Sequence, residues 1–434
     1  MVKNTKKNLL ILLLIVALDF ISFTLIFPLM PDLLIFYSNT FVYDSDIKII
    51  NFFIFLSGFI PTNVHHFIQN ENYVVVLMGG FFSSLFSFLQ FLFSPLWGKF
   101  SDLKGRKLVL TLSSLGMAIS YLIWFFSNSI SFFLVSRILA GVMAGNLSVA
   151  TVAISDLANH QNKTFYMGLL GMAMGIGFIL GPLLGGALYY LGKHIFQLEG
   201  AHPFAVCALG AFLLSMLSVI LNIFFFEETK SSLKITQESQ IFLTQQKMKN
   251  KLIRYLIFLN FIYMLIFTSF EFTFTFFYKF YFHFSPETIG LIFFYLGFLL
   301  AFSQGWITKK ISGKFSEKEL LVLGIFMLSV SFLFLFFSVS NVYFSLIALI
   351  PLAIGNAFFQ PSIASYVSQL AQMEKKGLTI GILRSTNSLS RVFGPLIGGF
   401  LFWIFGSKIY IIFSLLMVFL LLILLWTKKV FKIN

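Results

Sequence analysis

Five charged residues interrupt long apolar runs in this 434-residue sequence. Two are carboxylates, Asp19 and Glu271, and three are arginines, Arg137, Arg384 and Arg391. An ionisable group buried in hydrocarbon is costly unless it is paired or hydrated, so such groups often mark a path for ions, protons or substrate. A buried carboxylate can also exchange a proton. Asp19 and Glu271 are therefore candidate proton-coupling residues. The alternative is that each forms a permanent ion pair with a buried arginine and only fixes helix packing.

The composition indicates that these charges belong to a membrane protein. Apolar residues make up 58% of the chain and charged residues only 11%, against about 25% charged residues in ordinary soluble domains. This excludes a soluble enzyme. The net charge of +14 comes from short basic islands rather than a basic groove with interleaved aromatics, so we expect no nucleic-acid partner. One cysteine, scattered histidines and the lack of a nucleotide-binding loop predict no metal and no cofactor.

Twelve apolar runs are long enough to cross a membrane as helices. About 20 helical residues span the hydrocarbon, where unpaired backbone groups are not tolerated. We therefore expect an all-α protein embedded in a lipid bilayer, with spans at 8–36, 73–97, 108–127, 130–153, 165–191, 203–226, 252–280, 287–308, 320–339, 342–368, 377–404 and 409–427.

The distribution of lysine and arginine predicts that both termini lie in the cytoplasm, because basic loops are retained on that side. With this orientation, only four basic residues fall on the outer side: Lys48, Lys193, Lys279 and Lys408. In a bacterium the protein would lie in the inner membrane. The first span lacks a small-residue cleavage site, so we expect it to be retained.

Two longer connections organise the chain. The polar segment 227–250 predicts a cytoplasmic linker between an N-terminal six-helix bundle, 1–226, and a C-terminal one, 251–434. The outer loop 37–72 contains an apolar patch, Ile47 to Ile60, that is too short to span. It is consistent with a re-entrant or interfacial segment.

The two halves share internal repeats. The string G-P-L-L-G-G at Gly181 to Gly186 recurs as G-P-L-I-G-G at Gly394 to Gly399, an offset of 213 residues. The basic segment Gly98 to Lys107 has a weaker counterpart at Gly305 to Lys314. This pattern favours duplication into two pseudo-symmetric bundles, the usual architecture of secondary transporters, with a binding site between the halves.

Several motifs resemble those of one transporter family. The residues after the second span match G-x-x-x-D-x-x-G-R-K/R, the loop signature of the major facilitator superfamily, at Gly98, Asp102, Gly105, Arg106 and Lys107. Arg137, with two following glycines, resembles a fourth-helix motif of that family. The glycine-rich fifth span resembles the fifth-helix motif of the drug/proton antiporters within that family. The segments around Asp19, Phe270 to Phe276 and Leu383 to Ser385 look most like the tetracycline-transporter-like branch.

The resemblance implies roles for some of these residues. Asp102 would pair with Arg106 and lie against the N-terminus of the eleventh helix, latching the inner gate, and Asp156 would complete the charge network. The alternative is that the basic loop only sets topology. Arg137 would assist proton transfer by lowering the proton affinity of a nearby carboxylate, or it would serve only as a structural partner.

Further residues are candidates for the substrate cavity. Arg384 and Arg391 are seven residues apart and share one helix face, and the surplus of buried arginines over carboxylates favours an anionic cargo. The polar side chains of Gln90 and Asn146 would contact substrate or merely bond to neighbouring helices. Phe274 lies in a phenylalanine-rich stretch that would line a cavity or face lipid.

Small residues in the fifth and eleventh spans predict close helix packing, and proline there supplies a bend. The residues concerned are Gly177, Gly181, Pro182, Gly185, Gly394 and Pro395.

The sequence thus predicts a monomeric secondary transporter that exports lipophilic drugs or organic anions in exchange for protons by alternating access. An uncoupled facilitator or importer of a small metabolite is the nearest alternative, and a multipass receptor or enzyme is a more distant one. The long outer loop departs from the bacterial tetracycline pumps and disfavours tetracycline itself as the cargo.

Overall fold

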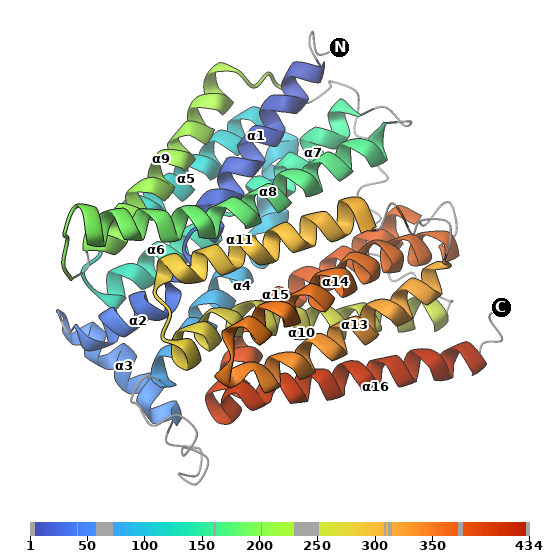
Figure 1. Cartoon of the computed structure of the whole chain (residues 1–434). Coiled ribbons are helices and arrows are strands. Elements are labelled where there is room, and N and C mark those ends of the chain that lie inside the picture. The colour runs from blue at the N-terminus through green and yellow to red at the C-terminus, as the bar shows by residue number, and fades with distance from the viewer. Residues whose placement is uncertain are drawn as a thin grey trace. The chain divides into compact units, whose positions relative to one another are not determined.

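The described part of the chain is made of helices and short turns (Figure 1). Internal contacts divide the chain into two units. The N-terminal unit is Met1–Ser232 with His283–Phe294, and the C-terminal unit is Leu233–Phe282 with Tyr295–Asn434. The computed structural model describes residues 5–40, 42–57, 73–158, 162–200, 202–229, 251–307, 310, 315–371 and 376–430.

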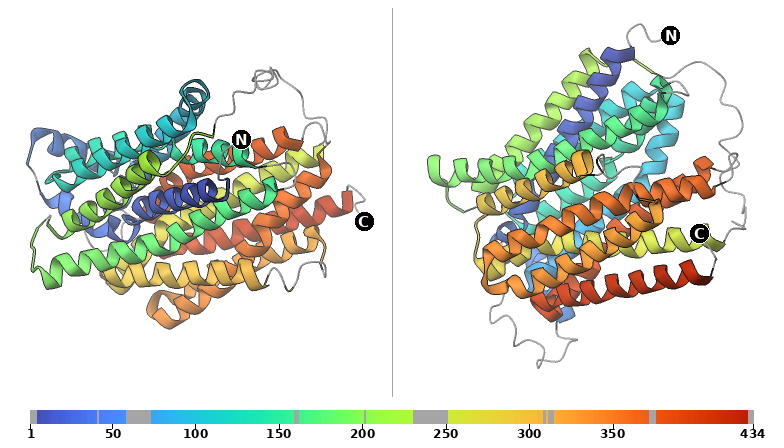
Figure 2. Two further views of the ribbon diagram at one scale, coloured as in Figure 1. Left: turned by 90° about the horizontal axis from the view of Figure 1, so that it is seen from above. Right: turned by 45° about the vertical axis from the view of Figure 1, so that its right-hand side comes forward.

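In the N-terminal unit, α1 packs against both α8 and α9, and α5 packs against α9 and α6 (Figures 1 and 2). The first part of α11 also belongs to this unit. The helices are α1 Thr5–Thr24, α2 Met30–Asn39, α3 Asp44–Ser57, α4 Tyr73–Lys104, α5 Arg106–Phe125, α6 Ile130–Met143, α7 Asn146–Leu157, α8 Lys163–Tyr190, α9 His202–Phe224 and α11 Pro286–Phe302.

In the C-terminal unit, α10 packs against α15, and α13 packs against both α14 and α16. The helices of this unit, besides the remainder of α11, are α10 Lys251–Phe282, α13 Glu317–Phe337, α14 Val342–Leu370, α15 Lys376–Phe405 and α16 Ile409–Val430.

The predicted all-helical membrane fold is confirmed. Eleven helical stretches of the described residues are long and apolar enough to cross a membrane. The last of them, Thr379–Leu425, contains two helices, α15 and α16, separated by the turn Gly406–Lys408, in which Gly406 has a φ of 55°. The two helices give the twelve expected spans. Most of the proposed linker and residues 58–72 of the outer loop lie outside the described residues.

Two spans that the sequence reads as continuous helices are interrupted. The first bends between α1 and α2, where Pro28 lies in a short 3₁₀ turn. The fourth divides into α6 and α7 at Gly145, which lies beneath the Trp97 ring with no room for a Cβ atom. Trp97 fixes this break by donating its indole N–H to the Val142 carbonyl at 2.7 Å. The break leaves Asn146 as the first residue of α7.

The glycine-rich helices of the two units make equivalent contacts. In the N-terminal unit, the Thr24 hydroxyl on α1 donates to the Gly177 carbonyl on α8 at 2.9 Å. In the C-terminal unit, the Thr268 hydroxyl on α10 donates to the Ser390 carbonyl on α15 at 3.0 Å. Positions 177 and 390 are related by the 213-residue offset of the sequence repeat.

The contact of α1 with α8 and that of α10 with α15 are here called the helix seams. The helices approach closely at both seams because glycine lies there. A Cβ on Gly181 would lie 2.7 Å from the Ile21 carbonyl oxygen, and one on Gly185 would fall against the Leu25 carbonyl. In the other unit, a Cβ on Gly394 would meet Thr268. The prolines that follow Gly181 and Gly394, Pro182 and Pro395, lie inside α8 and α15.

Candidate functional site

The Asp19 carboxylate lies buried in the N-terminal unit among neutral polar groups. Asn146 Nδ2 donates to its Oδ2 atom at 2.6 Å, and the Ser114 hydroxyl lies 3.4 Å from the same atom. The side chain is 6% exposed. Among the described residues, no cation lies within 4.0 Å of the carboxylate, and its Oδ1 atom has no hydrogen-bond partner. Asp19 is therefore held by neutral donors and not by an ion pair.

Arg137 on α6 is also buried, and aromatic rings surround it. Its guanidinium carbon lies 5.3 Å from the centre of the Phe133 ring, 5.4 Å from Trp124 and 5.7 Å from Tyr121. In the part of the chain that the structure describes, no carboxylate is within 4.0 Å of Arg137. The negative faces of the rings stabilise its charge instead.

Glu271 on α10 has different surroundings. It is half-buried, and the charged residue that interacts with it electrostatically is Arg391 on α15. Within the described ranges, Glu271 makes no hydrogen bond and no ion pair within 4.0 Å. Arg384 and Arg391 are both exposed on α15, two helical turns apart. The C-terminal unit thus places two arginines on one helix face, with one carboxylate near the second.

Two of the predicted cavity residues lie near the break between α6 and α7. Gln90 is half-buried and donates to the Ala144 carbonyl at 3.4 Å, and Asn146 binds Asp19. Phe274 is fully buried in the C-terminal unit, where it packs against Phe270 and Tyr278 at ring distances of 5.3 and 5.0 Å. Contact of these residues with substrate stays a prediction.

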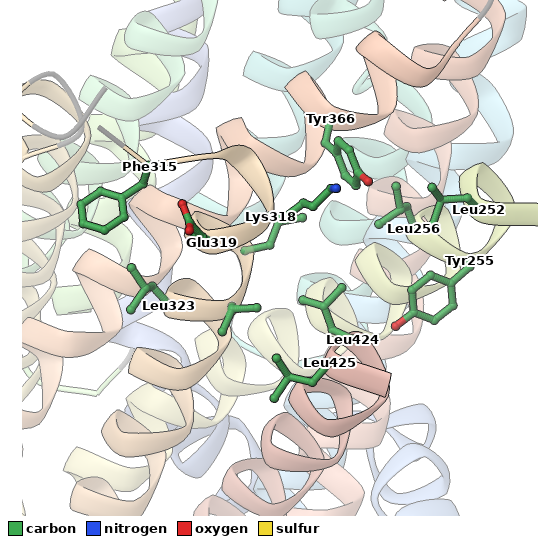
Figure 3. A pocket seen from close by; sticks show the side chains of 12 residues that line it. Leu252, Tyr255, Leu256, Phe315, Lys318, Glu319, Leu323, Tyr366, Leu424 and Leu425 are labelled. Carbon is green, nitrogen blue, oxygen red and sulfur yellow. The ribbon is translucent and has the colours of Figure 1, made fainter. Parts of the chain in front are cut away.

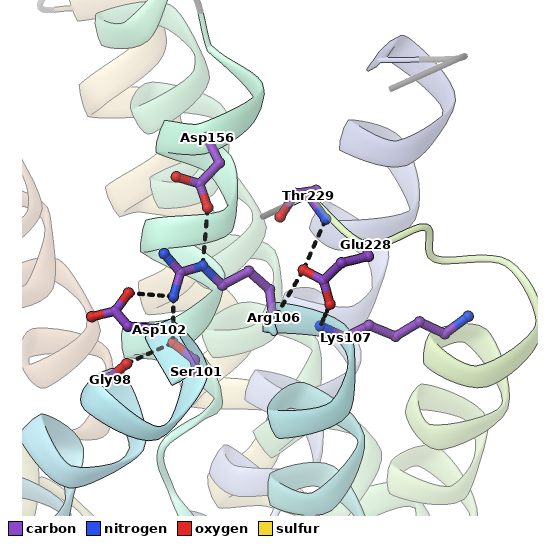
Figure 4. A network of polar contacts seen from close by, with 8 residues as sticks. All are labelled: Gly98, Ser101, Asp102, Arg106, Lys107, Asp156, Glu228 and Thr229. Carbon is purple, nitrogen blue, oxygen red and sulfur yellow. Dashed lines mark hydrogen bonds and ion pairs between the residues drawn. The ribbon is translucent and has the colours of Figure 1, made fainter. Parts of the chain in front are cut away.

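The loop signature builds a compact charge network between α4, α5 and α7 (Figure 4). The guanidinium of Arg106 contacts Asp102 at 2.5 Å and Asp156 at 3.0 Å, and it donates to the Ser101 hydroxyl at 2.8 Å. Gly105 makes the turn before α5 with a φ of 100°, a conformation that favours glycine. Gly98 accepts a hydrogen bond from Ser101 through its carbonyl.

The network contains a residue that sequence reasoning missed, Glu228. Its carboxylate accepts the backbone N–H groups of Arg106 and Lys107, at 2.9 and 3.1 Å, and so caps the N-terminus of α5 (Figure 4). A carboxylate is favourable there because the helix dipole is positive. Capping residues usually lie next to their helix, and Glu228 is more than a hundred residues away, so no local pattern indicated it.

The chain around Glu228 is held in place by the start of α1. The side-chain amide of Asn8 donates to the Glu227 carbonyl and accepts its N–H, both at 2.9 Å. These two bonds hold the chain that follows α9 beside α1, and Glu228 then contacts the N-terminus of α5. The beginning of the proposed linker is thus attached to the N-terminal unit.

A mostly apolar pocket of about 320 Å³ lies within the C-terminal unit (Figure 3). Lys318 points across it, with its ammonium 5.8 Å from the centre of the Tyr366 ring. None of the predicted site residues lines this pocket. Its lining consists of Leu252, Tyr255, Leu256, Phe315, Lys318, Glu319, Leu321, Val322, Leu323, Tyr366, Leu424 and Leu425.

Comparison with known proteins identifies relatives over nearly the whole chain. The model of the Major Facilitator Superfamily matches residues 12–316 and 256–432. Major facilitator superfamily domain-containing protein 10 of Mus musculus is 30% identical over 440 residues, covering 98% of this chain and 94% of the relative. The class H tetracycline resistance protein of Pasteurella multocida is 28% identical, covering 93% of this chain and 94% of that protein.

The structure of a human relative shows the same fold. The crystal structure of the human organic anion transporter MFSD10 (TETRAN) aligns with a TM-score of 0.72 and 27% sequence identity, covering 97% of this chain and 99% of that one. These relatives are transporters and not enzymes, and they imply a small-molecule substrate. The chain is a multipass membrane protein that belongs to the major facilitator superfamily.

Proposed function

We propose that this protein is a monomeric, proton-coupled exporter of lipophilic compounds or organic anions that works by alternating access. Both termini would lie in the cytoplasm and, in a bacterium, the protein would lie in the inner membrane. The two six-helix bundles, 1–226 and 251–434, would move against each other around a central site. The relatives support this class of cargo, because they include an organic anion transporter and tetracycline resistance proteins.

The surroundings of Asp19 are the main observation behind proton coupling. A carboxylate in a salt bridge stays ionised, because losing its charge would leave the cation unpaired. Asp19 instead receives hydrogen bonds from the neutral groups of Asn146 and Ser114. Such a group can alternate between its charged and neutral forms as its hydration changes. Asp19 is therefore the favoured proton carrier, with Glu271 as a second candidate.

Arg137 supports the release of that proton. It carries a buried positive charge with no carboxylate within 4.0 Å in the described chain. Helix α5 connects it to Asp19, because Ser114 on α5 donates to Asp19 and the ring of Tyr121 on α5 lies 5.7 Å from the Arg137 guanidinium carbon. A fixed positive charge favours the ionised form of a nearby carboxylate. We propose that movement of α6 relative to α1 changes this influence and so times proton release.

The C-terminal unit supplies the positive charge that we assign to cargo binding. Arg384 and Arg391 are exposed on α15, and Glu271 interacts with the charge of Arg391. One carboxylate cannot neutralise both arginines, so an anionic group on the cargo would be attracted. Gln90, Asn146 and Phe274 are proposed as further cavity residues.

We assign the network around Arg106 to gating. Asp102 and Asp156 hold this arginine at the junction of α4 and α5, and Lys107 follows it as the second residue of α5. Breaking and reforming a charge network is a common way to stabilise one state of an alternating cycle. The network would hold the inner side closed while the outer side is open.

Purified protein in liposomes tests this function. Carboxyfluorescein, as an organic anion, and tetracycline would be offered outside vesicles with an acidic interior, and uptake measured with and without the pH gradient. We expect gradient-driven uptake of the anion by molecules whose cytoplasmic side faces outward. Asp19→Asn should remove the response to the gradient, and Asp44→Asn, at an exposed carboxylate, should keep it. Uptake that ignores the gradient would indicate a facilitator, and uptake driven by external acid an importer.

A further inference from the structure

The short helix α3, in the outer loop, is attached to the first turn of α6 by one buried carboxylate. Asp46 is fully buried and accepts hydrogen bonds from the backbone N–H and the hydroxyl of Ser131, at 3.0 and 2.5 Å. It also accepts the N–H groups of Val42 and Tyr43 at 3.2 and 2.9 Å. Ser131 is the second residue of α6, where a carboxylate also interacts favourably with the helix dipole.

The faces of α3 differ in the burial and polarity of their side chains. Asp46, Ile50 and Phe53 are buried and share one face, as expected for positions i, i+4 and i+7. The opposite face carries Asp44, Lys48 and Asn51 in its first two turns, with the same spacing and all exposed, and Phe55, which is 65% exposed, continues this face in the last turn. The flanks between these faces carry exposed apolar side chains, at Ile47, Phe52 and Leu56, with exposures of 43%, 51% and 39%.

The packing of Phe53 gives the depth of α3 relative to the membrane. Phe53 contacts Phe81 and Phe82 of α4, with ring centres 5.5 and 6.4 Å away. Lys99 lies near the other end of α4. It is 17 residues after Phe82, which corresponds to a rise of about 25 Å along the helix. The hydrocarbon core is about 30 Å thick. With Lys99 at one membrane surface, Phe53 lies close to the opposite boundary of the hydrocarbon.

The apolar surface of α3 is continuous with a surface that must face lipid. Tyr43 directly precedes α3, and its ring lies 5.9 Å from that of Phe132 on α6. Phe132 and Val135 are 49% and 52% exposed on this membrane-spanning helix. A run of exposed apolar side chains therefore extends from α6 through Tyr43 to Ile47 on α3.

We infer that α3 is an interfacial helix that lies on the outer surface of the membrane, with its apolar flanks in contact with phospholipid and its polar face toward the headgroups. Helices of this kind place apolar side chains at the boundary between headgroups and acyl chains, and basic residues near the phosphates. Asp44, Lys48 and Asn51 then lie in the polar layer. This inference excludes a re-entrant path for residues 44–57, because the buried Asp46 fixes the start of the helix at the first turn of α6.

Spin labels at single cysteines along α3 test this position. The native Cys207 is buried and would be replaced by serine. Labels at Ile47, Phe52 and Leu56 would be measured in phosphatidylcholine vesicles containing one-fifth phosphatidylglycerol, with oxygen as the lipid-soluble relaxation agent and a nickel chelate as the water-soluble one. We expect several-fold higher accessibility to oxygen than to nickel at these positions. Labels at Asp44 and Lys48 should show the reverse, and a label at Phe53 should be shielded from both.

Two results would overturn the inference. High nickel accessibility at Ile47, Phe52 and Leu56 would place the flanks in water, and shielding from both agents would mean that another protein segment or a second copy covers them. Asp46→Ala in the Phe53 label background provides a second measurement, because loss of the attachment to Ser131 should expose the Phe53 label several-fold. An unchanged label there would show that Asp46 does not hold the helix.

Discussion

The two halves of the molecule keep the same helix seam and differ in the charges beside it. A threonine hydroxyl on α1 binds a backbone carbonyl of α8, and the equivalent bond joins α10 to α15. The carboxylates on α1 and α10 have different partners: Asp19 has the neutral hydrogen-bond donors Asn146 and Ser114, whereas Glu271 has the charge of Arg391. The helix packing is therefore alike in the two units, whereas the surroundings of the carboxylates differ. The N-terminal unit is therefore the better candidate for proton exchange and the C-terminal unit for cargo charge.

The largest expected difference is between the two carboxylates. Asp19→Asn removes the group that can carry a proton, so gradient-driven transport should fall by about 100-fold, the low end of what a positioned acid or base contributes. Glu271→Gln should leave the response to the gradient in place and alter mainly the concentration of anion that gives half-maximal uptake. Flux assays in proteoliposomes measure both. Equal loss of gradient dependence in the two variants would contradict the division of roles.

The shared seam predicts equal damage in the two halves. Gly181→Val and Gly394→Val each force side-chain atoms into the facing helix, and overpacking of this kind costs about 1–3 kcal/mol. Both variants should unfold at lower temperature in detergent, by similar amounts. Gly175→Ala and Gly381→Ala are matched controls on the same helices, because a Cβ at either position meets nothing within 4 Å. A large effect in one half only would indicate that the seams are not equivalent.

The two arginines of α15 test whether the C-terminal unit binds the charge of the cargo. If Arg384 and Arg391 attract an anionic cargo, Arg384→Gln and Arg391→Gln should each raise the half-saturating concentration of carboxyfluorescein about tenfold, which corresponds to about 1.4 kcal/mol. Transport of a neutral lipophilic compound should change much less. The measurement is a saturation curve for both compounds in each variant. Unchanged anion uptake would remove these arginines from the binding site.

Glu228 allows a smaller test of the network in the N-terminal unit. Glu228→Gln retains the shape of the side chain but loses the charge at the N-terminus of α5, which should cost about 0.5–1 kcal/mol. The control is Glu227→Gln, because the neighbouring Glu227 is equally exposed but binds Asn8 only through its backbone. Thermal unfolding of the two variants under the same conditions measures the difference. Equal stability would mean that water replaces the cap.

Sequence reasoning located the helices and part of the site because both depend on local patterns. The hydrocarbon thickness fixes the length of an apolar run, and the spacing of Asp102 and Arg106 puts them one helical turn apart, which is where their ion pair forms. The break at Gly145 has no such signal, because glycine within an apolar run reads as continuous helix. It depends on Trp97, which lies on another helix.

The sequence did not predict which side chains on different helices contact one another. The sequence offered arginine and carboxylate as natural pairs, but Arg137 is surrounded by the rings of Tyr121, Trp124 and Phe133, and Asp19 binds Asn146. A chain so rich in phenylalanine and tyrosine gives no indication of which rings will meet a cation. These choices depend on how helices turn toward one another, which hydropathy does not specify.

For a third carboxylate, Asp46, we expect the smallest effect of pH. It therefore contrasts with Asp19, which we propose exchanges protons. Burial disfavours its charged form, but hydrogen bonds from the Ser131 side chain and from backbone N–H groups outweigh this and hold the pKa of Asp46 below its ordinary value. A carboxyl whose pKa is lowered by folding stabilises the folded arrangement above its unfolded pKa, about 4, and loses that contribution only as the pH falls through the lower, folded value. The attachment of α3 to α6 should therefore be constant between about pH 8 and about pH 5. Accessibility of a spin label at Phe53 across this range measures it. A transition within the range would mean that Asp46 is not the charged anchor, and the contrast between an anchoring and an exchanging carboxylate would be lost.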